Sequence, residues 1–195
     1  MHTMPVVICL LRGVNVGGHN KIRMDALREL CASLKLRGAE TLLQSGNVVF
    51  QSDEADLGAL GARIEKAIER KAGVQTNVIL RTTSELRDAI AKNPFAARKG
   101  IEPAKLAVTF LARDADPDAR AKLAALPPVP EELHLIGREL YTYFPNGMGR
   151  PTIKWPRVEK ALAVPVTGRN WNTVTKLLEM AERLEAGGRT SRASS

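Results

Sequence analysis

A loop rich in glycine, asparagine and basic side chains carries the residue types that most often bind anions. Residues 12–21 follow an apolar run and have the sequence RGVNVGGHNK. Glycine lets backbone N–H groups approach an anion closely, and arginine can bond a phosphate through two N–H groups at once. The candidate ligand-binding residues of this loop are Arg12, Asn15, Gly17, Gly18 and Lys21.

The spacing of this loop does not match a standard phosphate loop. Gly13 and Gly18 have the spacing of a G-x-x-x-x-G-K-[ST] motif, but Lys21 comes two positions late and no hydroxyl follows it. The dinucleotide fingerprint G-x-G-x-x-G is absent as well. A plain strand-to-helix turn would also explain the glycines, although it requires neither Arg12 nor Asn15.

A second polar stretch, Gln44–Asn47, lies between two short apolar runs. Its Gly46-Asn47 pair suits positive φ and indicates a hairpin turn. Ser45 and Asn47 are candidate ligand-binding residues. A nucleophilic serine needs a nearby base, and His19 is the histidine whose position best allows it. A tight turn held by a hydrogen-bonding asparagine is the alternative interpretation.

A third polar motif precedes the last expected helix, and it supplies the candidates Arg169, Asn170, Trp171 and Asn172. Either asparagine can cap the helix, and Arg169 can pair with phosphate or carboxylate. Trp171 offers a flat face for a base or sugar, or it packs in a core. Residues 150–176 hold six basic side chains and one acid, which indicates either a nucleic-acid contact or a solvated face.

Composition narrows the class of protein. The chain has 195 residues, 44% of them hydrophobic but only 4% aromatic, so we expect a packed core of Leu, Val, Ile and Ala. The run Val6–Leu11 is too short for a signal sequence or a membrane span.

Cys9 and Cys31 lack CxxC spacing and are expected to be buried, reduced thiols of a cytoplasmic protein. No metal-ligand spacing is present, and we expect no metal or cofactor.

Hydrophobic periodicity and turn residues divide the chain into alternating strands and helices. The first half has predicted strands at 5–11, 41–43, 48–50 and 75–80, a helix over 24–34 stopped by Gly38, and a helix capped by Ser52 and ended by Gly73. A connecting helix at 84–92 follows. The second half has predicted strands at 105–112, 133–136, 139–144 and 164–166, with helices at 117–126, 156–163 and 173–186, the last ended by Gly187.

Each half therefore has the β-α-β-β-α-β order of a ferredoxin-like fold. The predicted class is α+β, with two such halves and mixed or antiparallel sheets. The predicted boundaries are 1–81 for the first half, 82–104 for a connecting helix and linker, 105–186 for the second half, and 187–195 for a disordered tail.

Several motifs resemble a known bacterial family. They are LLRGVNVGG at 10–18 with NKI at 20–22, QSGNVVF at 44–50, RT at 81–82 with EL at 85–86, NPF at 93–95, and TGRNWNTV at 167–174 with KL at 176–177. Together they are similar to the family of domains of unknown function numbered 1697 (DUF1697), over about residues 5–180. The resemblance implies a duplicated ferredoxin-like architecture and no established activity.

The function expected from these residues is binding of an anionic ligand, either nucleic acid or a phosphorylated small molecule. Whether the chain is an enzyme stays open, since no complete set of nucleophile, base and orienting group is visible. One alternative is a phosphoester or acyl-group enzyme using Ser45, His19 or Lys21, and another is a protein-interaction module. The first two polar loops are expected to converge only if the second strand, taken as antiparallel to the first, is short.

Overall fold

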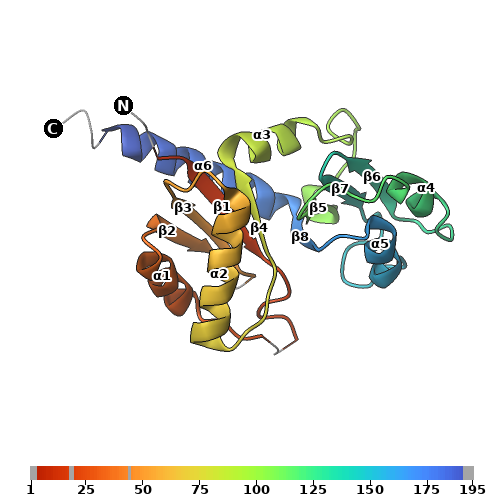
Figure 1. Ribbon diagram of the computed structural model, residues 1–195. Helices are drawn as coiled ribbons and strands as arrows, with labels where there is room; N and C mark the ends of the chain where they lie inside the picture. The colour runs from red at the N-terminus through yellow and green to blue at the C-terminus, as the bar shows by residue number, and fades with distance from the viewer. Residues whose placement is uncertain (1–3, 18–19, 44, 191–195) are drawn as a thin grey trace. The chain divides into compact units, whose positions relative to one another are not determined.

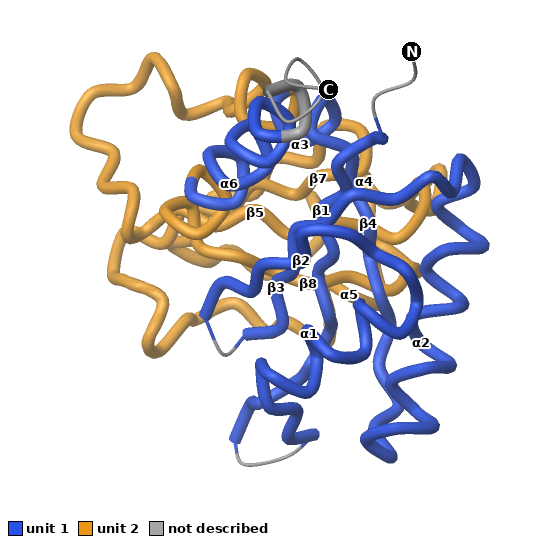
Figure 2. The backbone as a smooth tube through the Cα atoms, turned by 90° about the vertical axis from the view of Figure 1, so that its left-hand side faces the viewer, with its two compact units in different colours: residues 1–87, 176–195 blue, residues 88–175 orange. Residues whose placement is uncertain are grey.

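The structure is a computed structural model that describes residues 4–17, 20–43 and 45–190, with side chains as far as Gly187. The chain forms two compact units (Figure 2), which are described separately. The first unit comprises residues 1–87 and 176–195, and the second comprises residues 88–175. Helices α3 (Thr83–Ala91) and α6 (Trp171–Thr190) each begin in one unit and end in the other.

The first unit contains one four-stranded antiparallel sheet with strand order β2-β3-β1-β4. Its elements, in chain order, are β1 (Val6–Leu11), α1 (Met24–Ser33), β2 (Arg37–Leu42), β3 (Asn47–Gln51), α2 (Leu57–Ala72) and β4 (Val78–Thr82). This is the ferredoxin-like order of elements. Figure 1 shows α1 and α2 on the same face of the sheet.

The second unit repeats the arrangement with strand order β6-β7-β5-β8. Its elements are the 3₁₀ helix η1 (Pro103–Lys105), β5 (Leu106–Leu111), α4 (Ala119–Ala124), β6 (Glu132–Ile136), β7 (Glu139–Tyr143), α5 (Trp155–Leu162) and β8 (Val166–Asn170). Neighbouring strands are again antiparallel. The predicted α+β class with two ferredoxin-like halves is therefore confirmed.

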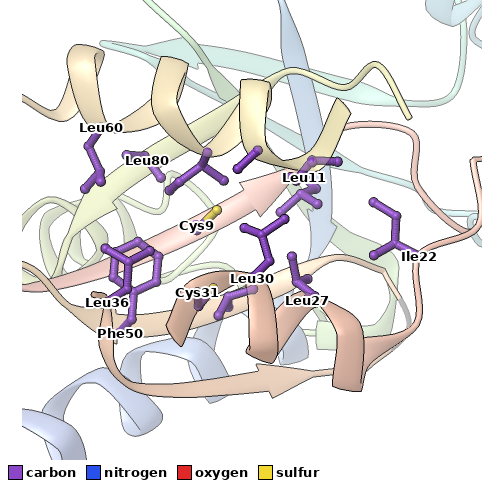
Figure 3. Close-up of a cluster of buried hydrophobic side chains, with 14 of the residues drawn as sticks. Cys9, Leu11, Ile22, Leu27, Leu30, Cys31, Leu36, Phe50, Leu60 and Leu80 are labelled. Atoms are coloured by element: carbon purple, nitrogen blue, oxygen red, sulfur yellow. The ribbon is translucent and has the colours of Figure 1, made fainter. Parts of the chain in front are cut away.

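The core of the first unit follows from alternation along its strands. Cys9 and Leu11 point from β1 toward the helices, where they meet Leu27 and Leu30 of α1 and Leu60 of α2 (Figure 3). Successive strand side chains point to opposite faces, so every second residue joins this cluster. Both cysteines are buried thiols, as predicted.

The intervening residues of β1, including Ile8 and Leu10, are also buried, so the opposite face of this sheet is covered as well. Part of the covering comes from α6. A Cβ built on Gly38 of β2 would lie 2.9 Å from Cδ1 of Leu184, and Arg183 pairs with Glu40 of the same strand. The last helix of the chain thus packs on the first sheet.

Several local predictions need correction. The N-cap of α2 is Asp56, whose Oδ1 accepts hydrogen bonds from two backbone N–H groups, while Ser52 lies earlier in the chain. Helix α1 ends at Ser33, before Gly38, because Lys35 already has a φ of 61°. The predicted end of the last helix at Gly187 is also wrong, since α6 continues to Thr190.

Candidate functional site

Three segments of the first unit meet at the carboxyl end of β1. The N–H of Leu11 donates to the carbonyl of Gly46 at 2.9 Å, and the N–H of Arg12 donates to the carbonyl of Asn77 at 2.9 Å. The loop after β1, the β2–β3 turn and the segment before β4 are therefore joined by backbone hydrogen bonds. Close packing supports the contact, because a Cβ built on Gly46 would clash with the side chain of Val14.

The convergence of the loop and the turn does not depend on the length of β2. Strand β2 is antiparallel to β3, and β3 is antiparallel to β1, so β2 runs in the same direction as β1. The turn that ends β2 therefore lies at the same end of the sheet as the loop that ends β1. The expectation of an antiparallel second strand was wrong, and the correct direction makes the convergence obligatory.

Arg12 lies at the centre of this end of the sheet and lines an open depression of about 510 Å³. Thr76 Oγ1 donates a 2.7 Å hydrogen bond to the carbonyl of Arg12, so the two sides of the depression are tied together. The side chain of Arg12 is half-buried. The residues that line the depression are Arg12, Gly13, Asn20, Gln75, Thr76 and Asn77.

The loop after β1 is held in shape by its own asparagines. Asn15 Nδ2 donates to the carbonyl of Ile22 and Asn15 Oδ1 accepts from the Ile22 N–H, both at 2.9 Å. Asn20 Nδ2 donates to the carbonyl of Gly13 at 3.1 Å. Asn15 and Asn20 both have positive φ, which asparagine tolerates better than most residues. Asn15 therefore shapes the loop, and it does not line the depression.

The other predicted residues of the loop lie apart from the lining. Gly17 is exposed and has a φ of 57°, as a turn glycine requires, and Lys21 is exposed. Gly18 and His19 lie outside the described residues.

The β2–β3 turn also differs from expectation. Asn47 is the first residue of β3 and is fully buried, which does not fit the ligand-binding role predicted for it. Its Nδ2 donates to the carbonyl of Leu42 and to Ser45 Oγ, each at 2.8 Å. Ser45 is exposed. The hydrogen bond from Asn47 cannot activate Ser45, because an amide nitrogen is a donor and takes no proton.

Arg169 is buried on strand β8, where the sequence had suggested a loop. Its Nη1 donates to Thr167 Oγ1 at 2.7 Å and to the carbonyl of Gly168 at 2.8 Å. The first unit has a matching arginine: Arg81 of β4 is buried and its Nη1 donates to the carbonyl of Leu80. Both arginines are the fourth residue of the last strand of their unit. A buried arginine at the same place in both units indicates a role in the fold. This role does not fit the ligand-facing role predicted for Arg169.

The rest of the third motif caps and begins α6. Asn170 Oδ1 accepts from the Asn172 N–H at 2.9 Å, which is the predicted capping interaction, and Asn170 Nδ2 donates to the carbonyl of Ala104. Trp171 is half-buried and Asn172 is exposed. These residues belong to the second unit, whereas the depression belongs to the first.

The basic segment is not a continuous row of available cations. Arg169 is buried, and Lys176 pairs with Glu179 at 2.8 Å. The remaining basic side chains are exposed: Arg150, Lys154, Arg157 and Lys160.

Sequence reasoning missed five of the residues that line the depression. They are Gly13, Asn20 and three consecutive polar residues, Gln75, Thr76 and Asn77. One signal was available. In a ferredoxin-like half the first and last strands are antiparallel neighbours, so the segment before the last strand meets the loop after the first. Three consecutive polar residues at that place are more than a strand start requires.

We also searched the described part of the chain for a reactive thiol, a metal site and a membrane-spanning helix. Burial raises the pKa of the Cys31 thiol to about 12, so this thiol is protonated at neutral pH and is a poor nucleophile. Within residues 4–17, 20–43 and 45–190, no three His, Cys, Asp or Glu side chains converge to hold a metal ion. None of the described helices is both long and apolar enough to cross a membrane.

Comparison with known proteins identifies the family of this chain. It is similar to the solved structure of the conserved bacterial protein SP0830 from Streptococcus pneumoniae, with a TM-score of 0.69 and 23% sequence identity over 92% of this chain and 99% of that one. This likeness shows the fold alone. No curated protein matches. The family model described as protein of unknown function (DUF1697) matches residues 4–141. The chain therefore belongs to the DUF1697 family.

Proposed function

We propose that this protein binds a small phosphate-bearing anion in the depression beside Arg12. The observation that carries the proposal is that a half-buried arginine lines a hollow whose other lining residues are glycine and neutral polar side chains. A guanidinium with reduced access to water interacts more strongly with an anion than one on an open surface. Gln75, Thr76 and Asn77 supply further hydrogen-bonding groups.

The shape of the loop supports close approach of a ligand. Gly13 has a φ of 62°, and a Cβ built there would meet nothing within 4 Å. The glycine is therefore required for its backbone conformation, and the space beside it is open. Backbone groups in such left-handed turns commonly contribute to anion sites.

A small ligand is favoured over nucleic acid by the distribution of charge. Nucleic-acid binding requires several cations along the phosphate backbone. The depression has a single arginine in its lining. Four cations of the basic segment are exposed, namely Arg150, Lys154, Arg157 and Lys160, but they belong to the second unit and none lines the depression. A compact phosphate group needs only one guanidinium and a few neutral donors.

An acid hydrogen-bonded to a lining residue should weaken anion binding. Glu69 of α2 accepts a 2.7 Å hydrogen bond from Gln75 Nε2. Its negative charge opposes a phosphate in the depression, and both groups are near the surface, where screening limits the effect. The substitution Glu69→Gln removes the charge and can keep the hydrogen bond, so it should tighten binding.

The direct test is calorimetric titration of the full chain with inorganic phosphate, pyrophosphate and a nucleoside monophosphate. We expect binding of at least one of them, a loss of about tenfold or more in Arg12→Gln, and a gain in Glu69→Gln. Arg70→Gln is the matched control, since Arg70 is an exposed arginine of the same unit outside the lining. Equal affinities in Arg12→Gln and the unsubstituted protein would refute the proposal.

Nucleic acid and catalysis are tested in the same series. A single-stranded oligonucleotide that binds more tightly than the small anions, with affinity falling steeply with salt, would replace the small-ligand proposal. Turnover of a phosphoester panel that disappears in Ser45→Ala would instead support an enzyme. Binding of neither ligand class would leave an interaction module.

A further inference from the structure

The second unit contains a separate hollow of about 280 Å³ with a different chemistry. Most of its lining is apolar, and two cationic side chains and a threonine complete it. The residues are Leu126, Pro127, Pro128, Val129, Thr152, Ile153, Lys154 and Arg157. All of them lie within the second unit, and none belongs to the depression beside Arg12.

Local sequence explains how the hollow forms. Pro127 and Pro128 follow α4 and stop it, which leaves the apolar segment 126–129 as one wall. The other wall is the segment that leads into α5. It is anchored by Glu131, which is buried and whose Oε1 accepts a 2.7 Å hydrogen bond from the Thr152 N–H. Glu131 thus ties the two walls together without being one of the lining residues.

Both charged side chains in the lining of the hollow are cationic. Lys154 and Arg157 are exposed, and neither forms a salt bridge with any acid in the part of the chain that the structure describes. Lys154 precedes α5 and Arg157 lies in its first turn, so both cations come from the wall that leads into α5. A carboxylate placed between them would gain two charge-assisted hydrogen bonds.

We propose that this hollow binds a small carboxylate with an apolar body. The apolar part lies against Leu126, Val129 and Ile153, and the carboxylate pairs with Lys154 and Arg157. Small-molecule sites commonly combine apolar walls with a few polar groups that fix orientation, and a volume near 280 Å³ suits a ligand at the small end of their range. Charge complementarity selects an anion over a neutral or cationic molecule of the same shape.

The proposal is tested on the full chain with three probes: 1-naphthoate, its neutral counterpart 1-naphthalenemethanol, and inorganic phosphate. Titrations followed by amide chemical shifts should show naphthoate binding with shifts at residues 126–129 and 152–157. The neutral probe should bind about tenfold more weakly, and phosphate should not displace naphthoate from this site. Absence of naphthoate binding, or equal affinity for the alcohol, would overturn the proposal.

Two variants separate charge from shape. The double substitution Lys154→Gln and Arg157→Gln should reduce naphthoate affinity about tenfold, whereas Lys92→Gln with Lys99→Gln, two exposed lysines of the same unit, should leave it unchanged. Thr152→Trp fills the hollow from an exposed position and should abolish binding while both charges remain. Binding that survives Thr152→Trp would place the ligand elsewhere. Arg12→Gln should not affect naphthoate, so this proposal and the first can fail independently.

Discussion

The hydroxyl of Thr76 donates a 2.7 Å hydrogen bond to the backbone carbonyl of Arg12, although the two residues are 64 positions apart. The backbone of Arg12 is also held through its N–H, which donates a hydrogen bond to the carbonyl of Asn77. The segment before β4 therefore holds the backbone from which the Arg12 side chain projects. A binding site at this place relies on that segment for its geometry as much as on the arginine.

Thr76→Val should lower both stability and anion affinity, because it keeps the shape of the side chain and removes the hydroxyl. We expect a loss of about 0.5–1.5 kcal/mol in the free energy of unfolding, measured by urea denaturation. Thr76→Ser retains the donor and should restore most of the anion affinity. A Thr76→Val protein with unchanged stability and unchanged anion binding would show that the hydrogen bond does not position Arg12.

Asn15→Ala should destabilise the protein by about 1–3 kcal/mol, because both hydrogen bonds to Ile22 are lost. Part of this loss of stability comes from the backbone, because alanine tolerates the φ of 55° at this position less well than asparagine does. Asn15→Gly removes the same hydrogen bonds but relieves the backbone, so it should be less damaging than alanine by about 1 kcal/mol. Urea denaturation of the two variants measures each contribution. Little loss of stability in Asn15→Ala would return Asn15 to the list of ligand-facing candidates.

Cys31 should react slowly with thiol reagents in the native protein. Burial raises the pKa of its thiol from 9.0 to about 12, so little thiolate exists at pH 8.5 and access is restricted. The check is the labelling rate in a Cys9→Ala background, with and without denaturant. The stability that the neutral thiol contributes should be complete below pH 9 and should fall as the pH rises toward 12. Native labelling as fast as denatured labelling would contradict this burial.

The last helix should contribute to the stability of the protein mainly through its apolar face. Leu177 of α6 is fully buried, so Leu177→Ala should cost about 2–5 kcal/mol. The ion pair between Arg183 and Glu40 is half-exposed, and Arg183→Gln should cost no more than about 1 kcal/mol. Thermal and urea denaturation compare the two. A larger loss in Arg183→Gln than in Leu177→Ala would mean that charge holds this helix in place.

Local patterns were enough to predict most elements of the fold. The apolar run at Val6–Leu11 became β1, Gly73 ends α2 with a φ of 64°, and Gly137 makes the turn between β6 and β7 with a φ of 59°. Each of these features depends on residues that are close together in sequence, so the amino-acid sequence alone is enough to predict it. The buried state of Cys9 and Cys31 followed in the same way from their apolar surroundings.

Contacts between distant segments could not be predicted from local patterns. Asn47 and Arg169 are polar and look accessible in sequence, but both lie on strands and are buried. Strand β3, which holds Asn47, has a neighbour on each side, whereas β8, which holds Arg169, pairs only with β5 at the edge of its sheet. Exposure of a strand residue depends on which elements cover each face of the sheet, and α6 returns to cover the first sheet from the far end of the chain.

The sequence by itself determined the alternation of strands and helices, the duplicated ferredoxin-like order and the presence of Arg12 in a glycine-rich loop. The tertiary structure alone decided which polar residues share a site. It set Gln75, Thr76 and Asn77 beside Arg12 and left Asn15 to shape the loop. The physical reason is the antiparallel pairing of β1 with β4, which joins the end of one strand to the start of another more than sixty residues later.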